Sequence, residues 1–180
     1  FRIIQSNSDL LLRLINDILD LSRLEANKVI LTSEDCDVVQ LCRQALSSVE
    51  MSRRESGNRF VFETKTDSFV LQTDIQRLQQ VLINLLTNAA KFTKNGTITL
   101  QFEVEKEKNR VLFAVADTGC GIPKEKQKQV FERFEKLNEY AQGTGLGLSI
   151  CKLTVDKWGG DIWIDPDYED GARFVVSHPL

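Results

Sequence analysis

The chain has 180 residues, of which 42% are hydrophobic and 27% charged, with a formal net charge of -3. This length and composition fit one globular domain plus an appendage. The balance of 23 basic against 26 acidic residues gives neither the basic surface of a nucleic-acid-binding protein nor a polybasic membrane patch. No apolar run reaches the length of a membrane span, and no signal peptide is evident.

Residues 1–28 are predicted to form a long helix that needs partners. Its apolar residues follow a heptad, widened on one side: Ile4, Leu10, Leu11, Leu14, Ile15, Ile18, Leu21 and Leu24. Because no second helix of matching pattern follows, we expect its partner upstream or in another copy of the chain. A solitary core helix is the alternative. Since the pattern is already helical at Phe1, we expect the sequence to be a piece of a longer protein.

The next segments alternate between helical and strand patterns. Polar residues 32–37 mark a boundary, after which residues 38–54 are predicted to form a helix. Residues 59–64 and 69–73 are predicted to form short strands, the first with Phe60 and Phe62 on one face.

The stretch from Asp74 to Thr93 predicts an amphipathic helix with polar groups on one narrow face. Beside a broad apolar arc, Asn84, Asn88 and Lys91 are spaced by four and three residues, with Arg77 in the same sector. Amide oxygens can coordinate Mg²⁺, and an ammonium group one turn further can neutralise phosphate. The helix therefore suits a metal-nucleotide, although a core helix whose exposed face happens to carry these residues remains the alternative.

Residues 97–106 and 110–116 alternate as the arms of a hairpin, which gives an α+β order of elements. The second arm runs into the sequence DTGCGIP, beginning at Asp117. A carboxylate there can accept a hydrogen bond from an exocyclic amine such as that of adenine, while the glycines allow close approach. The DTG turn is also compatible with an ordinary loop. An aspartic protease would need a second catalytic Asp and a β-rich chain, and both are lacking.

Residues 124–135 are predicted to be helical, with Val130, Phe131 and Phe134 as an apolar patch. The sequence GTGLGLS from Gly143 then leads into a predicted helix over residues 146–158. Glycines before a helix N-terminus expose N–H groups to an anion, which indicates a phosphate cradle. The spacing matches neither a Walker A loop nor a GxGxxG dinucleotide loop. Residues 161–165 and 172–177 are the predicted closing strands.

Four boxes in this order, NLLTNAAKF, DTGCG, FERF and GTGLGL, resemble the catalytic, ATP-binding domain of sensor histidine kinases. The wider superfamily includes DNA gyrase, MutL and Hsp-type chaperones. The resemblance implies a two-layer α/β sandwich of the Bergerat type, with helices on one face of a mixed, largely antiparallel sheet, preceded by a bundle-forming helix. It places residues 30–180 in the catalytic domain and residues 1–29 in the second helix of the dimerisation and histidine-phosphotransfer domain.

The resemblance also implies roles for individual residues. Asn88, with Asn84 beside it, would bind Mg²⁺, Lys91 would contact phosphate, and Phe92 would line the site. Asp117 would bind the adenine amine. The remaining nucleotide-binding residues it implies are Gly119, Gly121 and Ile122 in the base pocket, Lys136 near the terminal phosphate, and Gly143, Thr144, Gly145, Leu146 and Gly147 in a mobile lid.

This sequence departs from the family at two positions and lacks a third feature of it. Lys136 and Arg173 stand where many relatives place an Arg and a Thr. The family's phosphoacceptor histidine lies on an upstream helix and is absent here, so we expect no autophosphorylation by this chain alone. His178, the only histidine, is interpreted as a solvated terminal residue.

The resemblance implies ATP and Mg²⁺ as ligands and a response-regulator receiver domain as a partner. It further implies pairing with the dimerisation and phosphotransfer domain, a homodimeric parent protein, and a cytoplasmic location. The parent protein's own membrane anchoring stays open. An ATP-driven conformational ATPase of the gyrase or chaperone type is the main alternative, and a degenerate interaction scaffold is a third. The four cysteines form no CxxC pair, and with one histidine they complete no zinc site, so we expect reduced, mostly buried thiols.

Overall fold

A computed structural model describes residues 2–26, 30–53, 57–127, 129–131 and 147–180, and the side chains of these except 2–10 and 13. The elements follow in chain order: α1 (Arg2–Glu25), β1 (Glu34–Asp37), α2 (Val38–Ser52), β2 (Arg59–Thr64), β3 (Val70–Thr73), α3 (Ile75–Phe92), β4 (Thr97–Glu105), η2 (Lys106–Lys108), β5 (Arg110–Asp117), η3 (Lys124–Lys126), α4 (Gly147–Lys157), β6 (Ile162–Ile164) and β7 (Arg173–Pro179).

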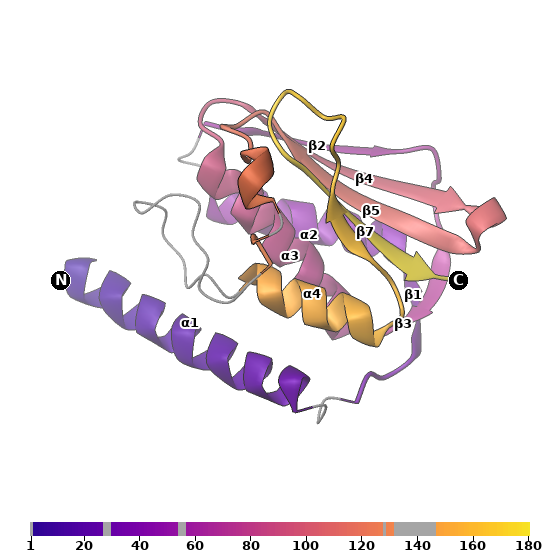
Figure 1. Cartoon of the computed structure of the whole chain (residues 1–180), viewed down its shortest axis with the longest axis horizontal. Helices are drawn as coiled ribbons and strands as arrows, with labels where there is room; N and C mark the ends of the chain where they lie inside the picture. Colours follow the sequence, from indigo (N-terminus) through magenta and orange to yellow (C-terminus); the bar gives the residue numbers. More distant parts are fainter. Residues whose placement is uncertain (1, 27–29, 54–56, 128, 132–146) are drawn as a thin grey trace.

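The main sheet has five strands in the order β2-β4-β5-β7-β6, and α2, α3 and α4 cover one of its faces (Figure 1). Only β2 and β4 pair in parallel, while the other neighbours are antiparallel. The predicted α+β architecture, with helices on one face of a mixed and largely antiparallel sheet, is therefore confirmed.

The core lies between the sheet and the helices, as the alternation along the strands predicts. Buried residues on β4 and β5, such as Leu100 and Phe113, face the buried residues of α3, among them Leu78, Leu82 and Leu86. The rings of Phe102 and Phe113 pack with centroids 5.2 Å apart. Apolar periodicity thus accounts for both layers.

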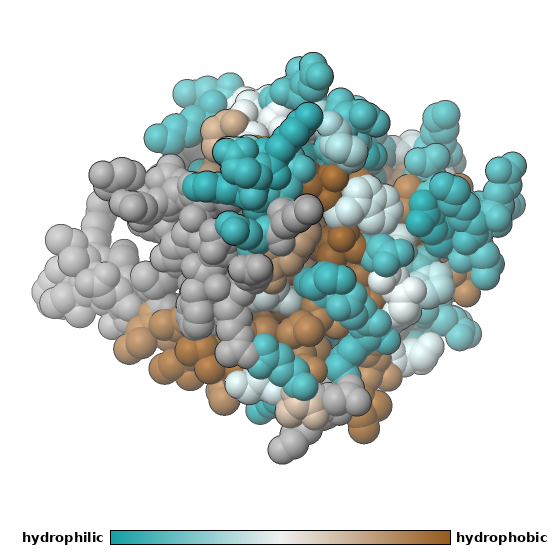
Figure 2. All heavy atoms as spheres, viewed as in Figure 1, coloured by the Kyte–Doolittle hydropathy of each residue, from teal (hydrophilic) through white to brown (hydrophobic). Residues whose placement is uncertain are grey.

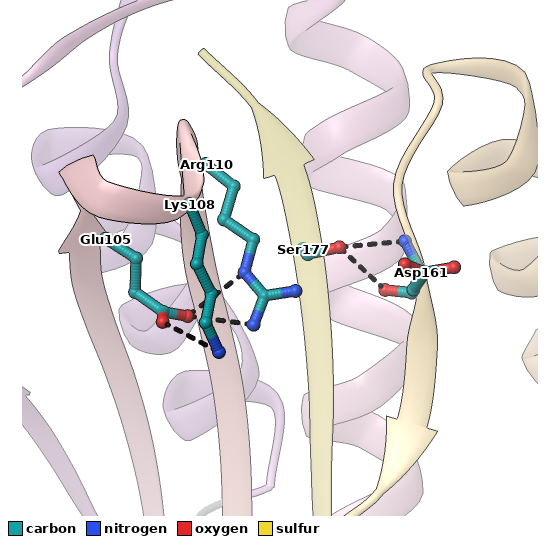
Figure 3. A network of polar contacts seen from close by, with 5 residues as sticks. All are labelled: Glu105, Lys108, Arg110, Asp161 and Ser177. Atoms are coloured by element: carbon teal, nitrogen blue, oxygen red, sulfur yellow. Dashed lines mark hydrogen bonds and ion pairs between the residues drawn. The ribbon is translucent and has the colours of Figure 1, made fainter.

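Two polar contacts tie down the ends of the main sheet (Figure 3). Arg110 at the start of β5 donates through Nε to Glu105 at the end of β4, at 3.1 Å, and so closes the hairpin. At the other side, the N–H of Asp161 donates to Ser177 Oγ at 2.8 Å, which joins the turn after α4 to β7. The first contact thus connects β4 with β5, and the second connects the segment before β6 with β7.

The structure corrects three predictions about local structure. Residues 32–37, predicted to be a polar boundary, contain the strand β1, which pairs antiparallel with β3 in a separate two-stranded sheet. Residues 124–135 were predicted to be helical, but their described part holds only the short 3₁₀ helix η3, followed by turns. Pro123 precedes η3, and in the described turn at residues 129–131 the side chain of Val130 is buried in the core.

His178 is the third correction, because it is only 6% exposed. It lies on β7, a strand paired on both sides, and points toward the helices. Its ring packs against Trp158, the residue that follows α4, with centroids 4.9 Å apart, and Nε2 lies 3.0 Å from the Thr73 hydroxyl. The interpretation of His178 as a solvated residue rested on its proximity to the chain end and is therefore wrong.

The long helix α1 packs its C-terminal half on α4, so part of its apolar stripe is covered within this chain. Leu21 and Leu24 are buried with Ile150, and Leu14 and Leu153 pack beside them. Other apolar side chains of α1 remain exposed: Leu11, Leu12, Ile15, Ile18 and Leu19. Figure 2 shows a brown patch along the lower edge of the molecule, where α1 lies. Among the described helices, none combines the length and apolarity of a membrane span.

Candidate functional site

The polar residues predicted on the central helix lie along one half-buried line of α3. Asn84, Asn88 and Lys91 are each partly exposed, whereas their neighbours Leu85, Leu86, Ala89 and Ala90 are buried. Asp74 caps the helix by accepting a hydrogen bond from the N–H of Arg77 at 3.1 Å. The apolar arc therefore sets the rotation of α3, and this rotation presents amide and ammonium groups at its surface.

Asn84 joins this helix to the start of α4. Its Nδ2 donates to the carbonyl of Gly147 at 3.4 Å, and a Cβ on Gly147 would lie 3.8 Å from Asn84 Cγ. One turn into α4, Cys151 is fully buried, and burial raises the pKa of its thiol to about 12. The structure thus brings Asn84 and Gly147 together, and the neighbouring thiol stays protonated.

Asp117 lies at the end of β5 as a carboxylate that is 3% exposed. Its Oδ1 accepts hydrogen bonds from the N–H groups of Gly119, at 3.0 Å, and Ala172, at 3.2 Å. Burial raises the pKa of the Asp117 carboxyl above its usual value, while these two N–H groups act in the opposite direction. Among the described residues, none donates a hydrogen bond to Oδ2, so this oxygen is the available acceptor.

The turn after Asp117 presses against the C-terminal end of α3. The N–H of Cys120 donates to the carbonyl of Phe92 at 3.3 Å. A Cβ on Gly119 would lie 2.1 Å from the same carbonyl oxygen, so only glycine fits there. Gly121 has a φ of +71°, and Ile122 packs against the core. The turn that carries these predicted base-pocket residues therefore packs against the C-terminal end of α3.

Several predicted site residues are brought together and others cannot be placed. Asp117, Gly119, Gly121 and Ile122 lie on one turn beside Phe92, and Asn84 meets Gly147. Asn88 and Lys91 follow Asn84 along α3. The other predicted residues, Lys136, Gly143, Thr144, Gly145 and Leu146, lie outside the described residues.

Arg173 is directed away from this site. On β7 it pairs with Ala116, the residue before Asp117 on β5. Because successive side chains of a strand point to opposite faces, Arg173 lies on the face of the sheet opposite to the Asp117 side chain. There its guanidinium donates to Gln101 at 3.0 Å and pairs with Asp165 at 2.9 Å. The residue beside Asp117 is instead Ala172, which contributes a backbone N–H.

Two contacts of Asp117 were missed by sequence reasoning, namely the N–H of Ala172 and the hydroxyl of Tyr168, which donates to the Asp117 carbonyl at 2.8 Å. Both come from more than 50 residues away in sequence, and no local pattern indicates them. They are visible only once β5 and β7 are paired.

The polar groups on α3 are amide oxygens and an ammonium group, which suit a metal-nucleotide. Within the described part of the chain, no group of three or more His, Cys, Asp and Glu could hold a metal ion. A cation here would depend on amide oxygens such as those of Asn84 and Asn88, together with oxygens of a ligand, as Mg²⁺ commonly does.

The chain is similar in sequence to known histidine kinases. Residues 73–180 match the family model described as histidine kinase-, DNA gyrase B-, and HSP90-like ATPase. The circadian input-output histidine kinase CikA of Synechococcus elongatus is 38% identical over 183 residues, which cover 98% of this chain and 24% of CikA. The chain thus spans about a quarter of that relative's length.

Solved structures of histidine kinases also match. Full-length ShkA in complex with AMPPNP superimposes with a TM-score of 0.89 at 30% identity, covering 99% of this chain and 37% of ShkA. The catalytic domain of ThkA gives a TM-score of 0.73 at 33% identity, covering 82% of this chain and 95% of that domain. ThkA in complex with the response regulator TrrA gives 0.78 at 29% identity, covering 98% and 49%.

The family model and the matched histidine kinases together identify the family of this chain. The chain belongs to the histidine kinase-, DNA gyrase B-, and HSP90-like ATPase family, within which it is the catalytic, ATP-binding domain of a two-component sensor histidine kinase.

Proposed function

We propose that this domain binds ATP together with Mg²⁺ and presents the γ-phosphoryl group to a histidine on a helix outside this sequence, for relay to a response-regulator aspartate. The observation that carries the proposal is the buried Asp117 carboxylate, which keeps Oδ2 as an acceptor beside α3. Such an acceptor suits the 6-amino group of adenine. Catalysis then consists mainly of positioning and charge neutralisation.

The other site residues divide between the base and the phosphates. Phe92, Gly119, Gly121 and Ile122 would shape the base pocket, because they lie together at the end of α3. Asn88, with Asn84 beside it, would hold Mg²⁺, and Lys91 would contact a phosphate. Mg²⁺, when bound, would neutralise phosphate charge. The residues proposed to close over the phosphates are Lys136, Gly143, Thr144, Gly145, Leu146 and Gly147.

We further propose that residues 1–29 are the second helix of a dimerisation and phosphotransfer domain and that residues 30–180 are the catalytic domain. The exposed apolar residues of α1 support a helical bundle with a homodimeric parent protein. The ThkA complex with TrrA supports a receiver domain as a partner. A cytoplasmic location follows from this function, because the relay uses cytosolic ATP.

An ATP-driven conformational ATPase is less well supported. In such relatives the position of Asn84 carries a Glu that activates water, and an amide cannot act as a general base. Here the Asn84 amide group also donates to the Gly147 carbonyl. Efficient hydrolysis therefore lacks its base.

Calorimetric titration with ATP and Mg²⁺ tests the proposal. The unmodified chain should bind, and Asn88→Ala and Asp117→Ala should each weaken binding while the fold is retained. Asp117→Ala should also lower the melting temperature, because it leaves the N–H groups of Gly119 and Ala172 without their acceptor. Each variant removes a group worth on the order of 1–3 kcal/mol when it is buried against a ligand. Unchanged affinity in both variants would contradict the assignment of the site.

A further inference from the structure

Residues 168–172, in the segment between β6 and β7, contact both the backbone and the side chain of Asp117. The Tyr168 hydroxyl donates to the Asp117 carbonyl at 2.8 Å, and the N–H of Asp117 donates to the carbonyl of Ala172 at 2.9 Å. The N–H of Ala172 donates to Oδ1 at 3.2 Å. A Cβ on Gly171 would lie 2.2 Å from the Asp117 carbonyl oxygen, so the two backbones are in close contact.

These contacts restrict the direction of the remaining carboxylate oxygen. Both backbone polar groups of Asp117 are held by residues 168–172, and Oδ1 is held by Gly119 and Ala172 together. Since the backbone and one carboxylate oxygen are constrained, the position of Oδ2 is constrained as well.

Tyr168 contributes the only side-chain donor in this group of contacts from the segment. Burial raises the pKa of its phenol above the ordinary value, as do the negative charges of Asp117 and Asp170, while Arg173 acts in the opposite direction. The hydroxyl therefore remains protonated at neutral pH and remains a donor. Its ring is partly buried, so the hydroxyl is held in place rather than free to rotate away.

We propose that Tyr168 is a positioning residue that makes the site selective for a 6-amino purine over a 6-oxo purine. It acts through the hydrogen bond from its hydroxyl to the Asp117 carbonyl, which fixes the position of Asp117. The inference rests on the proposed function, because it assumes that Oδ2 of Asp117 faces the purine 6-position. Tyr168 itself does not touch the base.

The physical reason is that selectivity depends on a fixed acceptor. An amino group opposite Oδ2 gains a hydrogen bond, whereas an oxo group there places two acceptors against each other. If the Asp117 carbonyl loses its donor, the end of β5 can shift and the carboxylate can turn away from an oxo group. Binding of the 6-amino purine then weakens, while the 6-oxo purine loses a repulsion.

The test compares ATP with ITP, which differ at the 6-position and share the triphosphate. Titrations of each nucleotide, with Mg²⁺, are made on the parent chain, on Tyr168→Phe and on Glu169→Gln. Tyr168→Phe keeps the ring and removes the hydroxyl. Glu169→Gln is the matched control, because it alters the next residue of the same segment, whose side chain is exposed.

We expect Tyr168→Phe to weaken ATP binding about three- to tenfold, the range for one lost hydrogen bond. ITP binding should change less, so that the ATP to ITP ratio falls, whereas Glu169→Gln should leave the ratio unchanged. Equal loss for both nucleotides, or an unchanged ratio in Tyr168→Phe, would overturn the inference while leaving the proposed function intact. Failure of the parent chain to bind ATP would instead refute the proposed function.

Discussion

At the scale of single residues, Asp117 shows how two backbone donors determine the chemistry of a side chain. The N–H groups of Gly119 and Ala172 both point at Oδ1, so the atom at that position must be an acceptor. In an Asp117→Asn variant the amide oxygen must occupy this position, and the NH₂ group must replace Oδ2. The site would then offer a donor where the carboxylate offers an acceptor.

We therefore expect Asp117→Asn to weaken ATP binding by about tenfold or more, as expected for a lost hydrogen bond to a charged group. The fold should persist, because the shape and the Oδ1 contacts are retained. Calorimetry gives the affinity and thermal melting checks the fold. Wild-type affinity in Asp117→Asn would mean that Oδ2 does not face the ligand.

His178 gives a prediction about stability and pH. Its Nδ1 lies 2.7 Å from the Pro179 carbonyl, which can only accept, so Nδ1 carries the proton and Nε2 accepts from the Thr73 hydroxyl. Burial lowers the pKa of this imidazole below its ordinary value of 6.5, although the contact with Pro179 acts in the opposite direction. The folded state therefore favours the neutral ring.

A group with a lowered folded pKa binds fewer protons in the folded state than in the unfolded state, so stability rises with pH. The contribution of His178 should be complete above the unfolded pKa of about 6.5 and should be lost as the pH falls below it, by at most about 1.4 kcal/mol per pH unit. Urea unfolding from pH 7.5 to pH 5 measures this. His178→Gln cannot titrate and should show a smaller slope, and equal slopes would contradict the assignment.

At the scale of elements, α1 is attached to the catalytic domain by a polar contact as well as by its apolar cluster. Asp20 accepts a hydrogen bond from Gln80 of α3 at 2.9 Å, and it lies 3.7 Å from the Arg77 guanidinium. Arg77 in turn donates to Gln80 at 3.0 Å. Together with Leu21 and Leu24 against Ile150, these contacts connect α1 to both α3 and α4.

Asp20→Ala should loosen the C-terminal half of α1. It removes the hydrogen bond from Gln80, worth about 1 kcal/mol, and the carboxylate that pairs with the Arg77 guanidinium. We expect faster amide exchange in α1, with unchanged exchange in the middle of α3. Asp156→Ala is the matched control, since it breaks the exposed pair with Lys152 within α4. The idea fails if both variants exchange alike along α1.

Element prediction succeeded where one face of an element carries the apolar residues. The apolar arc of α3 gave its span almost to the residue, with Asp74 and Thr93 as its caps. The strand β1 was missed because EDCD has no alternation, and its pairing partner β3 lies more than 30 residues away. The contact of α1 with α4 was missed for a related reason, since a heptad indicates that a helix needs a partner without indicating which one.

At the scale of the whole molecule, the sequence predicts those parts of the site that come from one short segment. The prediction is incomplete for contacts that form between distant strands. Asp117 and its glycines form one turn, so a single motif indicates them. The donors from Tyr168 and Ala172 depend on the pairing of β5 with β7 and on the path of the chain between β6 and β7. Such contacts follow from topology, which periodicity does not determine.

The last prediction concerns phosphoryl transfer by the whole chain. Its only histidine is His178, which is 6% exposed and packed between Trp158 and Thr73, so it is poorly placed to meet a phosphate. With Asn84 in place of a hydrolytic Glu, the chain should bind ATP yet neither label itself nor hydrolyse ATP at an appreciable rate. Autoradiography with γ-labelled ATP measures the first, and phosphate release the second.

Transfer should appear when a separate dimerisation domain with an acceptor helix is supplied, because the phosphate-binding groups lack only a nucleophile within reach. Binding of the two proteins is measured in parallel, so that a failure to dock is distinguished from a failure of chemistry. Asp117→Ala serves as the control that should abolish labelling of the acceptor. Label retained on this chain alone, stable to alkali and labile to acid, would identify a phosphohistidine at His178 and contradict an acceptor outside this sequence.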